Sequence, residues 1–250
     1  MVLLKNLARI LYQIWVAFVF TFFMLLFLPG IILPGFFGPR AGAVTFFFMK
    51  LWSWVFSKLN VIPYKIVNRE KIERGKAYIY ISNHTSFLDL PGIAMTIRGQ
   101  FRPLAKKELL KLPVFGWITR VTCVVVDRSS NESRRKSLDH LKKILGLRIS
   151  ILIFPEGTQN RTKEIMQPFY DGAFRIAIET QEPLLPLAVV GANALMPPGT
   201  IPRRPGAIHI MVGDAIPTQG LTLADVTSLK ERARAAMLKL LEEGDKIHGR

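Results

Sequence analysis

The chain has 250 residues, enough for one large domain or for a domain with an appended segment. Half of the residues are hydrophobic and the formal net charge is +16, which points to an anionic partner such as a phosphorylated molecule or an anionic lipid surface. Nucleic acid is disfavoured as that partner, because no zinc-finger or RNP-like pattern accompanies the charge; a merely solvated basic surface is the plain alternative. The lone cysteine, Cys123, rules out an internal disulfide and fits a reducing compartment.

The first 60 residues contain no acidic residue. The uncharged stretch from Ile10 to Leu28 would span about 28 Å as a helix, close to the thickness of a bilayer core. Pro29-Gly30 is expected to break it, and a second apolar segment follows at 41–59. We therefore expect two parts: a helical hairpin at 1–60 that holds the protein to a membrane lipid surface, and a main domain at 61–250.

The orientation of this hairpin follows from its few charges. Lys50 in the middle of the second segment favours a helix that lies in the plane of the membrane, although a membrane-spanning hairpin stays open. Lys5, Arg9 and the basic main domain place that domain on the cytoplasmic side of the cytoplasmic (inner) membrane. A buried helix pair of a soluble protein is the alternative, and the length of the apolar run disfavours it.

From Val61 onward, short apolar runs alternate with helical stretches. This alternation predicts an α/β fold, a mixed and mostly parallel sheet of about seven strands covered by helices. The expected strands are 62–68, 77–82, 101–105, 123–127, 149–154, 185–190 and 207–212. The expected helices are 89–97, 107–111, 132–145, 172–180 and 222–243, the last starting with the capping-box pair Thr222 and Asp225.

The most informative stretch is the turn that follows the strand at 77–82. His84 lies there, between a buried strand and a helix start, where α/β proteins tend to place their chemistry. Asp89 follows five residues later, close enough to bond one ring nitrogen and leave the other free as a base. A turn histidine with a helix-capping aspartate is the structural alternative.

Two further stretches end strands. Arg128 follows the run 124–126, where its guanidinium could clamp a phosphate, although a surface ion pair is the simpler reading. Glu156 and Gly157 follow the strand at 149–154, where glycine lets the backbone approach a ligand; a plain turn is the alternative. The histidines are scattered, so the sequence predicts no metal site.

Read together and in order, these motifs resemble those of the glycerolipid acyltransferases. Asn83-His84 with Asp89 resembles their NHxxxxD motif, and Gly116 followed by 125–128 resembles their second block. The stretch 154–158 resembles the third block and 185–187 the fourth, so that the likeness covers about 60–220. It is greatest to the bacterial 1-acylglycerol-3-phosphate acyltransferases, which make phosphatidic acid.

The resemblance implies a direct acyl transfer. His84, oriented by Asp89, would take the proton from the free sn-2 hydroxyl of lysophosphatidic acid, which then attacks an acyl thioester carried on coenzyme A or on acyl carrier protein. No cofactor and no metal are implied. Arg128 would bind the acceptor phosphate. The candidate substrate-binding residues are Asn83, Lys106, Arg128, Glu156, Gly157, Thr158 and Arg161.

Two departures from the family pattern concern the acceptor. Gln159 stands where the third block commonly has arginine, and Asp171 where lysine is common; Arg161 would have to take the place of the first cation. An acceptor with less negative charge, such as a lyso-aminolipid, is therefore an alternative. A non-catalytic membrane-binding protein is another, and a lipid hydrolase using Ser86 a third, although no G-x-S-x-G elbow is present.

Overall fold

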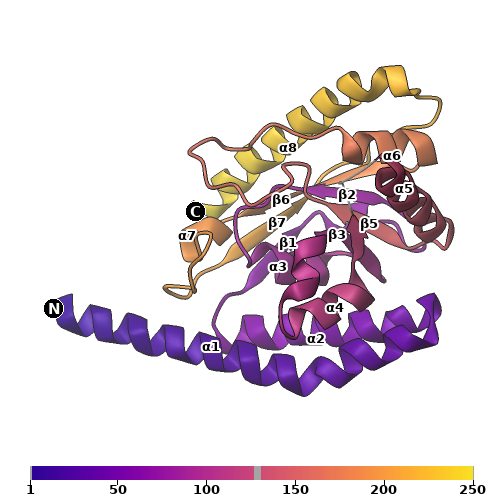
Figure 1. Ribbon diagram of the computed structural model, residues 1–250. Coiled ribbons are helices and arrows are strands. Elements are labelled where there is room, and N and C mark those ends of the chain that lie inside the picture. Colours follow the sequence, from indigo (N-terminus) through magenta and orange to yellow (C-terminus); the bar gives the residue numbers. More distant parts are fainter. Residues whose placement is uncertain (1, 127–130, 250) are drawn as a thin grey trace.

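The computed structural model describes residues 2–126 and 131–249. It contains a seven-stranded sheet with the order β1-β7-β6-β2-β5-β3-β4 (Figure 1). The strands are β1 Tyr64–Val67, β2 Ile79–Ser82, β3 Phe101–Lys106, β4 Val124–Val126, β5 Ser150–Ile153, β6 Leu184–Val190 and β7 Ile208–Val212. Each lies within two residues of its predicted bounds, so the predicted mixed sheet is confirmed.

The strand directions decide where functional residues gather. β2 pairs in parallel with β5 and β6, and β3 pairs in parallel with β5 and β4. β7 is antiparallel to β6, and β1 is parallel to β7. The carboxyl ends of β2, β3, β4, β5 and β6 therefore share one edge of the sheet, the edge where α/β proteins bind ligands.

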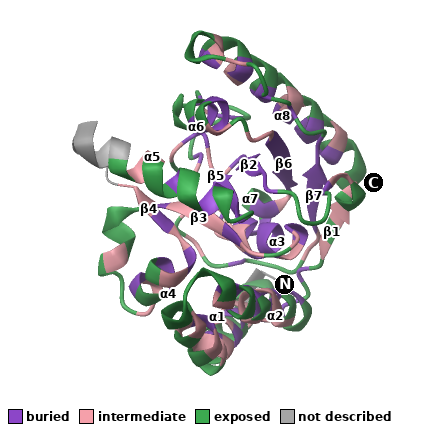
Figure 2. Ribbon diagram, turned by 90° about the vertical axis from the view of Figure 1, so that its right-hand side faces the viewer, coloured by how far each residue is buried: buried purple, intermediate pink, exposed green. Residues whose placement is uncertain are grey.

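Helices cover both faces of the sheet. The α-helices are α1 Val2–Ile32, α2 Gly42–Leu59, α3 Asp89–Thr96, α4 Phe115–Thr122, α5 Asn131–Gly146, α6 Gly172–Thr180, α7 Ala192–Leu195 and α8 Val226–His248. Short 3₁₀ turns lie at Leu33–Phe37, Pro39–Ala41, Arg69–Lys71, Lys107–Lys111 and Leu223–Asp225. Figures 1 and 2 show α5, α6 and α8 on one side of the sheet and α1 and α2 on the other.

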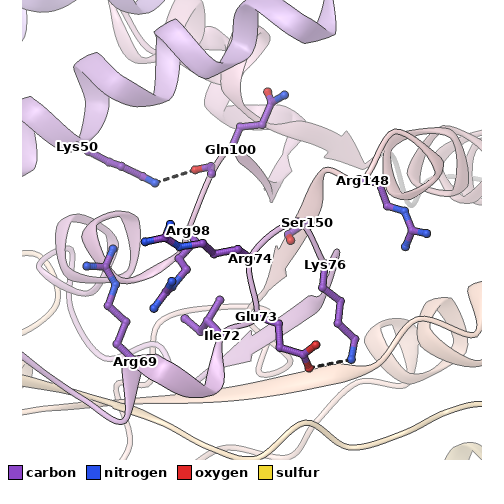
Figure 3. A pocket seen from close by; sticks show the side chains of 12 residues that line it. Lys50, Arg69, Ile72, Glu73, Arg74, Lys76, Arg98, Gln100, Arg148 and Ser150 are labelled. Atoms are coloured by element: carbon purple, nitrogen blue, oxygen red, sulfur yellow. Dashed lines mark hydrogen bonds and ion pairs between the residues drawn. The ribbon is translucent and has the colours of Figure 1, made fainter.

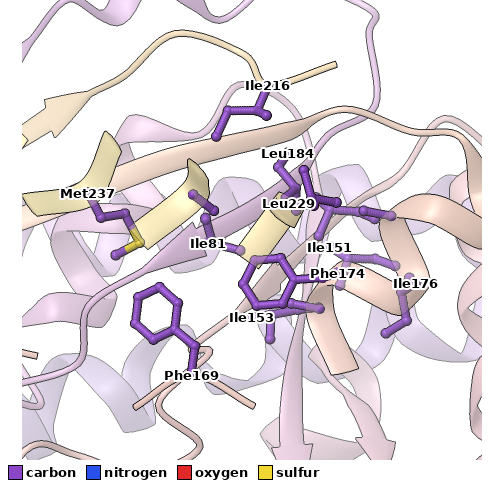
Figure 4. Packing of buried hydrophobic residues seen from close by; sticks show 14 of the residues in the cluster. Ile81, Ile151, Ile153, Phe169, Phe174, Ile176, Leu184, Ile216, Leu229 and Met237 are labelled. Atoms are coloured by element: carbon purple, nitrogen blue, oxygen red, sulfur yellow. The ribbon is translucent and has the colours of Figure 1, made fainter. Parts of the chain in front are cut away.

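Two apolar cores result, because successive strand side chains point to opposite faces. Ile79 and Ile81 of β2 pack with α5, α6 and α8, and Figure 4 shows this core around Phe174 and Leu229. Tyr80, which lies between the two isoleucines, packs in the second core with residues of α1, α2 and α3.

The first helix departs from the prediction. Pro29-Gly30 was expected to end it, but α1 continues to Ile32 with Pro29 inside. Gly30 serves packing instead: a Cβ at this position would lie 2.5 Å from the ring of Phe48 in α2. The chain turns at the 3₁₀ segments that start at Leu33, and α2 then runs back along α1 (Figure 1).

α1 has two unlike sides. Val16 and Val19 are buried in the second core, and the Tyr12 hydroxyl donates a 2.8 Å hydrogen bond to the carbonyl of Asn60. The outward side is apolar yet exposed, as Figure 2 also shows. This outward stripe comprises Leu4, Leu7, Leu11, Ile14, Phe18, Phe22 and Leu25. By length and composition the segment Leu4–Phe37 could cross a membrane, and only 22% of its most apolar window is buried.

Of the other helices, α8 follows its predicted start signal and α4 does not follow from the sequence. The Thr222–Asp225 capping box is confirmed, with the Thr222 N–H donating to Asp225 Oδ2 at 2.8 Å, and its first turn is 3₁₀. α4 was not predicted, because it is short and rich in residues that favour strands. It begins after Val114, a non-glycine residue with φ of 62°.

Candidate active site

His84 lies in the loop between β2 and α3, at the carboxyl edge of the sheet. Its ring Nδ1 is 2.9 Å from Asp89 Oδ2, and Asp89 is the first residue of α3. A carboxylate accepts hydrogen bonds, so the proton of the neutral ring belongs on Nδ1. Nε2 then carries the lone pair and can accept a proton.

Asp89 is fixed by more than the histidine. The same oxygen, Oδ2, accepts hydrogen bonds from the backbone N–H groups of Thr85 and Ser86, at 2.8 and 2.9 Å. Asp89 is fully buried, and its other oxygen, Oδ1, has no hydrogen-bond partner among the described residues. The three hydrogen bonds to Oδ2 hold the carboxylate against Nδ1 and so fix the orientation of the imidazole.

The plane of the imidazole is set by an aromatic ring. Phe154, which directly follows β5, stacks on His84 with 4.0 Å between ring centroids and 19° between the planes. The His84 side chain keeps 16% of its surface exposed. The ring is thus held on two sides and still reachable by a substrate.

Glu156 holds the backbone of the same turn. Its Oε1 accepts a 3.0 Å hydrogen bond from the His84 N–H, and its Oε2 accepts one of 2.8 Å from the Gln167 N–H. Burial raises the pKa of Glu156, and the two backbone hydrogen bonds oppose that effect. Each carboxylate oxygen holds a backbone N–H, one of them that of His84, so Glu156 positions the His84 turn; its predicted contact with a substrate stays a prediction.

Asn83 also serves the framework. Its side-chain Nδ2 donates to the Val189 carbonyl at 3.0 Å, and its Oδ1 accepts from the Val189 N–H at 2.8 Å. Asn83 is 2% exposed. The amide extends the pairing of β2 with β6 beyond the last strand residue, and the predicted contact of Asn83 with a substrate stays a prediction.

The remaining predicted residues of the third block form a turn beside His84. Gly157 has φ of 72°, a backbone conformation that glycine adopts without strain. The Asn160 N–H donates to the His84 carbonyl, and its Oδ1 accepts from the N–H of Thr162 at 2.9 Å. Thr158 and Arg161 are exposed on this turn.

The predicted cations lie near the same edge by topology. Lys106 is exposed at the end of β3, in register with Val126 at the end of β4. Arg128 lies outside the described residues. Lys106, the loop at Arg161 and the histidine turn all follow neighbouring parallel strands, so the structure brings them to one edge.

The two departures have different surroundings. Asp171 pairs with Lys230 of α8 at 2.7 Å, so its negative charge is offset on the α6–α8 side of the molecule. The Gln159 carbonyl accepts a 3.4 Å hydrogen bond from the Gln167 side chain. Asp171 was expected to weaken phosphate binding, but its charge is paired with that of Lys230.

Ser86 is held as a structural residue. Its Oγ donates a 2.7 Å hydrogen bond to the Met196 carbonyl and accepts one of 3.2 Å from the Leu88 N–H. Ser86 is fully buried. A nucleophilic serine needs an exposed hydroxyl beside a base, and Ser86 offers neither that exposure nor a free proton.

Sequence reasoning missed several residues that build this site. Besides Phe154, Asn160 and Gln167, Tyr64 of β1 takes part: its hydroxyl donates to the Leu88 carbonyl at 2.9 Å. Burial raises the pKa of Tyr64, and the neighbouring Asp89 carboxylate raises it further. Phe154 lies in the third block and Asn160 follows it, so their positions could have indicated a role in the site. Nothing in the sequence around Tyr64 or Gln167 indicates one.

Comparison with known proteins places these features in a family. The chain belongs to the acyltransferase family, whose model matches residues 63–190. An uncharacterised acyltransferase of Schizosaccharomyces pombe is 33% identical over 185 residues, covering 73% of this chain and 66% of that protein. Human 1-acyl-sn-glycerol-3-phosphate acyltransferase alpha is 30% identical over 173 residues, covering 68% of this chain and 60% of its own length. The chain thus spans just under two thirds of these relatives.

The fold is that of a solved acyltransferase. The crystal structure of the 1-acyl-sn-glycerophosphate (LPA) acyltransferase PlsC from Thermotoga maritima matches with a TM-score of 0.77 and 19% identity. The match covers 94% of this chain and 97% of that one, so it includes the N-terminal helices as well as the sheet.

Proposed function

We propose that this protein transfers a fatty acyl group from an acyl thioester to the free sn-2 hydroxyl of lysophosphatidic acid, giving phosphatidic acid. The observation that carries the proposal is the His84–Asp89 pair, with Nδ1 bound at 2.9 Å and Nε2 left to accept a proton. The names of relatives such as the human enzyme support this acceptor.

The chemistry needs a base and no covalent enzyme intermediate. His84 Nε2 takes the proton of the acceptor hydroxyl as its oxygen attacks the thioester carbonyl carbon. The tetrahedral intermediate then collapses, the carbon–sulfur bond breaks, and the proton passes from the imidazolium to the leaving thiolate. A positioned base of this kind contributes about 10²–10⁴-fold, and the remainder comes from binding and orientation.

Substrate binding is assigned to Lys106 and Arg161 near this edge and, from the sequence pattern alone, to Arg128. Arg128, Lys106 and Arg161 bind the acceptor phosphate, and Gly157 and Thr158 border it. The donor is carried on coenzyme A or acyl carrier protein, both of which present anionic groups to the basic surface. No cofactor takes part beyond the donor itself.

The N-terminal helices set the site at a lipid surface. α1 packs along the domain through Val16 and Val19, so it lies in the membrane plane with its outward stripe in lipid, because a spanning helix would have to leave that core. Lys5 and Arg9 orient the protein to the cytoplasmic side of the cytoplasmic membrane. A lipid acceptor then reaches His84 without leaving the bilayer fully.

The test is an acyl-transfer assay with purified protein in neutral detergent. Acyl-coenzyme A and acyl carrier protein thioesters are offered with lysophosphatidic acid and, in parallel, with a lyso-aminolipid. The wild type is expected to form phosphatidic acid, and His84→Ala to lose about 10²–10⁴-fold of that rate while keeping its circular dichroism spectrum. Acylation of the aminolipid alone would show that the acceptor is an aminolipid and not lysophosphatidic acid. Full activity of His84→Ala would show that His84 is not the general base.

A further inference from the structure

A cationic pocket lies at the edge of the sheet opposite His84. Its volume is about 490 Å³, and its walls come from the segments that precede β2, β3 and β5, together with α2. The cations that line it are Lys50, Arg69, Arg74, Lys76, Arg98 and Arg148 (Figure 3). These residues come from four separate stretches of the chain, so the pocket exists only in the folded chain.

The charges of this pocket are not balanced by the protein. Glu73 is the one acid in its lining, and it is already bound to Lys76 at 3.0 Å. Within residues 2–126 and 131–249, neither Arg74, Arg98 nor Arg148 has an acidic partner in an ion pair. Figure 3 shows Arg74 and Arg98 near the middle of the group and Arg148 on its far side.

Two of the cations have a structural task. Lys50 Nζ donates to the carbonyls of Ile97 and Gly99, both at 2.7 Å, and Arg69 donates to those of Met95 and Thr96. They bind the carbonyls at the end of α3, where a helix favours cations. This task accounts for Lys50 and Arg69 and leaves the three unpaired arginines without an explanation.

The cations also disfavour one another. Burial, together with the charge of Arg69, lowers the pKa of Lys50 to about 8. Burial likewise lowers the pKa of Arg69, with Arg98 adding to the effect. An anion in the pocket would remove this repulsion.

We propose that this pocket binds the phosphate group of an anionic ligand, at a site separate from the one that carries His84. Its volume lies in the range of ordinary ligand sites, and arginine binds phosphate through two parallel hydrogen bonds. The phosphate belongs either to a lipid headgroup or to a free ion. Lys50 links the pocket to α2, whose outward residues Phe47 and Trp54 are exposed beside the proposed lipid surface.

The proposal is independent of the acyl transfer. Lys76 precedes β2 and His84 follows it, so the strand separates the two sites. α3 also runs between them, from Asp89 to the carbonyls held by Lys50 and Arg69. Binding is therefore measured directly, without recourse to activity.

The experiment compares thermal unfolding of the full-length protein in neutral detergent with two probes. One is inorganic phosphate against sodium chloride of equal ionic strength; the other is micelles doped with phosphatidylglycerol against phosphatidylcholine. Phosphatidylglycerol is neither the proposed acceptor nor the proposed product. A probe that binds the folded state should raise Tm by several degrees when its concentration is well above its Kd.

The variant Arg74→Gln/Arg98→Gln should lose this rise, while Arg234→Gln, an exposed arginine on α8 across the sheet, should keep it. The double variant removes repelling charges, so its Tm without probe should equal or exceed that of the wild type. If it fails to fold, Arg74→Gln alone, at an exposed position, carries the comparison. If only the lipid raises Tm, the ligand is a lipid headgroup. If only inorganic phosphate raises Tm, the ligand is a free ion. No rise with either, or a rise that persists in the double variant, would overturn the site.

Discussion

Glu156, at the end of β5, accepts a hydrogen bond from the backbone N–H of His84, which follows β2. The stretch 154–158 thus supports the His84 turn, because the Glu156 side chain binds the main chain of that turn. Phe154, two residues earlier, holds the ring itself by stacking. This relation gives Glu156 a definite and testable role.

Glu156→Gln should lower both stability and kcat. A glutamine offers one acceptor oxygen, so the N–H of His84 or of Gln167 loses its partner, at a cost of about 1–3 kcal/mol. We expect Tm to fall and kcat to fall more than KM rises, because the change displaces the base rather than a substrate contact. Thermal unfolding and steady-state kinetics check this; a change in KM alone would instead assign Glu156 to substrate binding.

Asp89→Asn should preserve the outline of the turn and disable the base. The amide can still accept hydrogen bonds through one oxygen, but it no longer stabilises a charged imidazole and can donate to Nδ1, which moves the ring proton to Nε2. We expect kcat to fall by about 10²-fold or more. The pH profile of kcat is the measurement, and an unchanged rate would show that the pair is only structural.

Ser86→Ala should keep acyl transfer. The hydroxyl is directed at the Met196 carbonyl, so its loss leaves that carbonyl without a bond and lowers stability by about 1–3 kcal/mol. The rate per folded molecule should stay within a few-fold of the wild type. A serine hydrolase would lose its activity in this variant, which makes the assay decisive between the two mechanisms.

Phe18→Glu/Phe22→Glu should release the protein from lipid. Both rings are about half exposed on the outward stripe of α1, so burying the exposed part of one phenylalanine in lipid stabilises binding by about 0.7–1.5 kcal/mol. Each change should therefore weaken vesicle binding by about three- to tenfold, and the added carboxylate weakens it further. Leu223→Glu, the same kind of change on the exposed turn before α8, is the control in a flotation assay. Equal flotation of all variants would contradict the membrane assignment.

Lys50 should give stability a measurable pH dependence. Its pKa is about 8 in the folded protein and near 10.5 when unfolded, so between these values the unfolded chain binds more protons. The contribution of Lys50 to stability thus rises as pH increases from 8 to 10.5. Lys50→Met should lack this part of the rise when unfolding is followed by urea titration. Identical slopes for the two proteins would contradict the lowered pKa.

The sequence predicts the local parts of this molecule well. The seven strands follow from short apolar runs, and the His84–Asp89 contact follows from five residues of separation in a single turn. The Thr222–Asp225 cap is local in the same way. Each of these features depends on neighbours along the chain, which a sequence displays directly.

Features that depend on distant residues were not predictable. The pairing of Asp171 with Lys230 joins two helices, and the amide of Asn83 bonds to Val189 across the sheet. The interpretation of 1–60 as a simple anchor also missed that Val16 and Val19 belong to the core. Deleting that segment would uncover a face of the domain, so substitutions on its outer side test membrane binding more cleanly.

The position of β1 has a consequence for how the chain reaches this structure. Tyr64 of β1 pairs with Ile208 of β7, so 144 residues must emerge before this first strand finds its partner. Contacts of such separation slow folding, because a long loop must close before they stabilise anything. The earliest part of the sheet is therefore the last to be completed, and during synthesis the apolar helices before it emerge while β1 still has no partner strand.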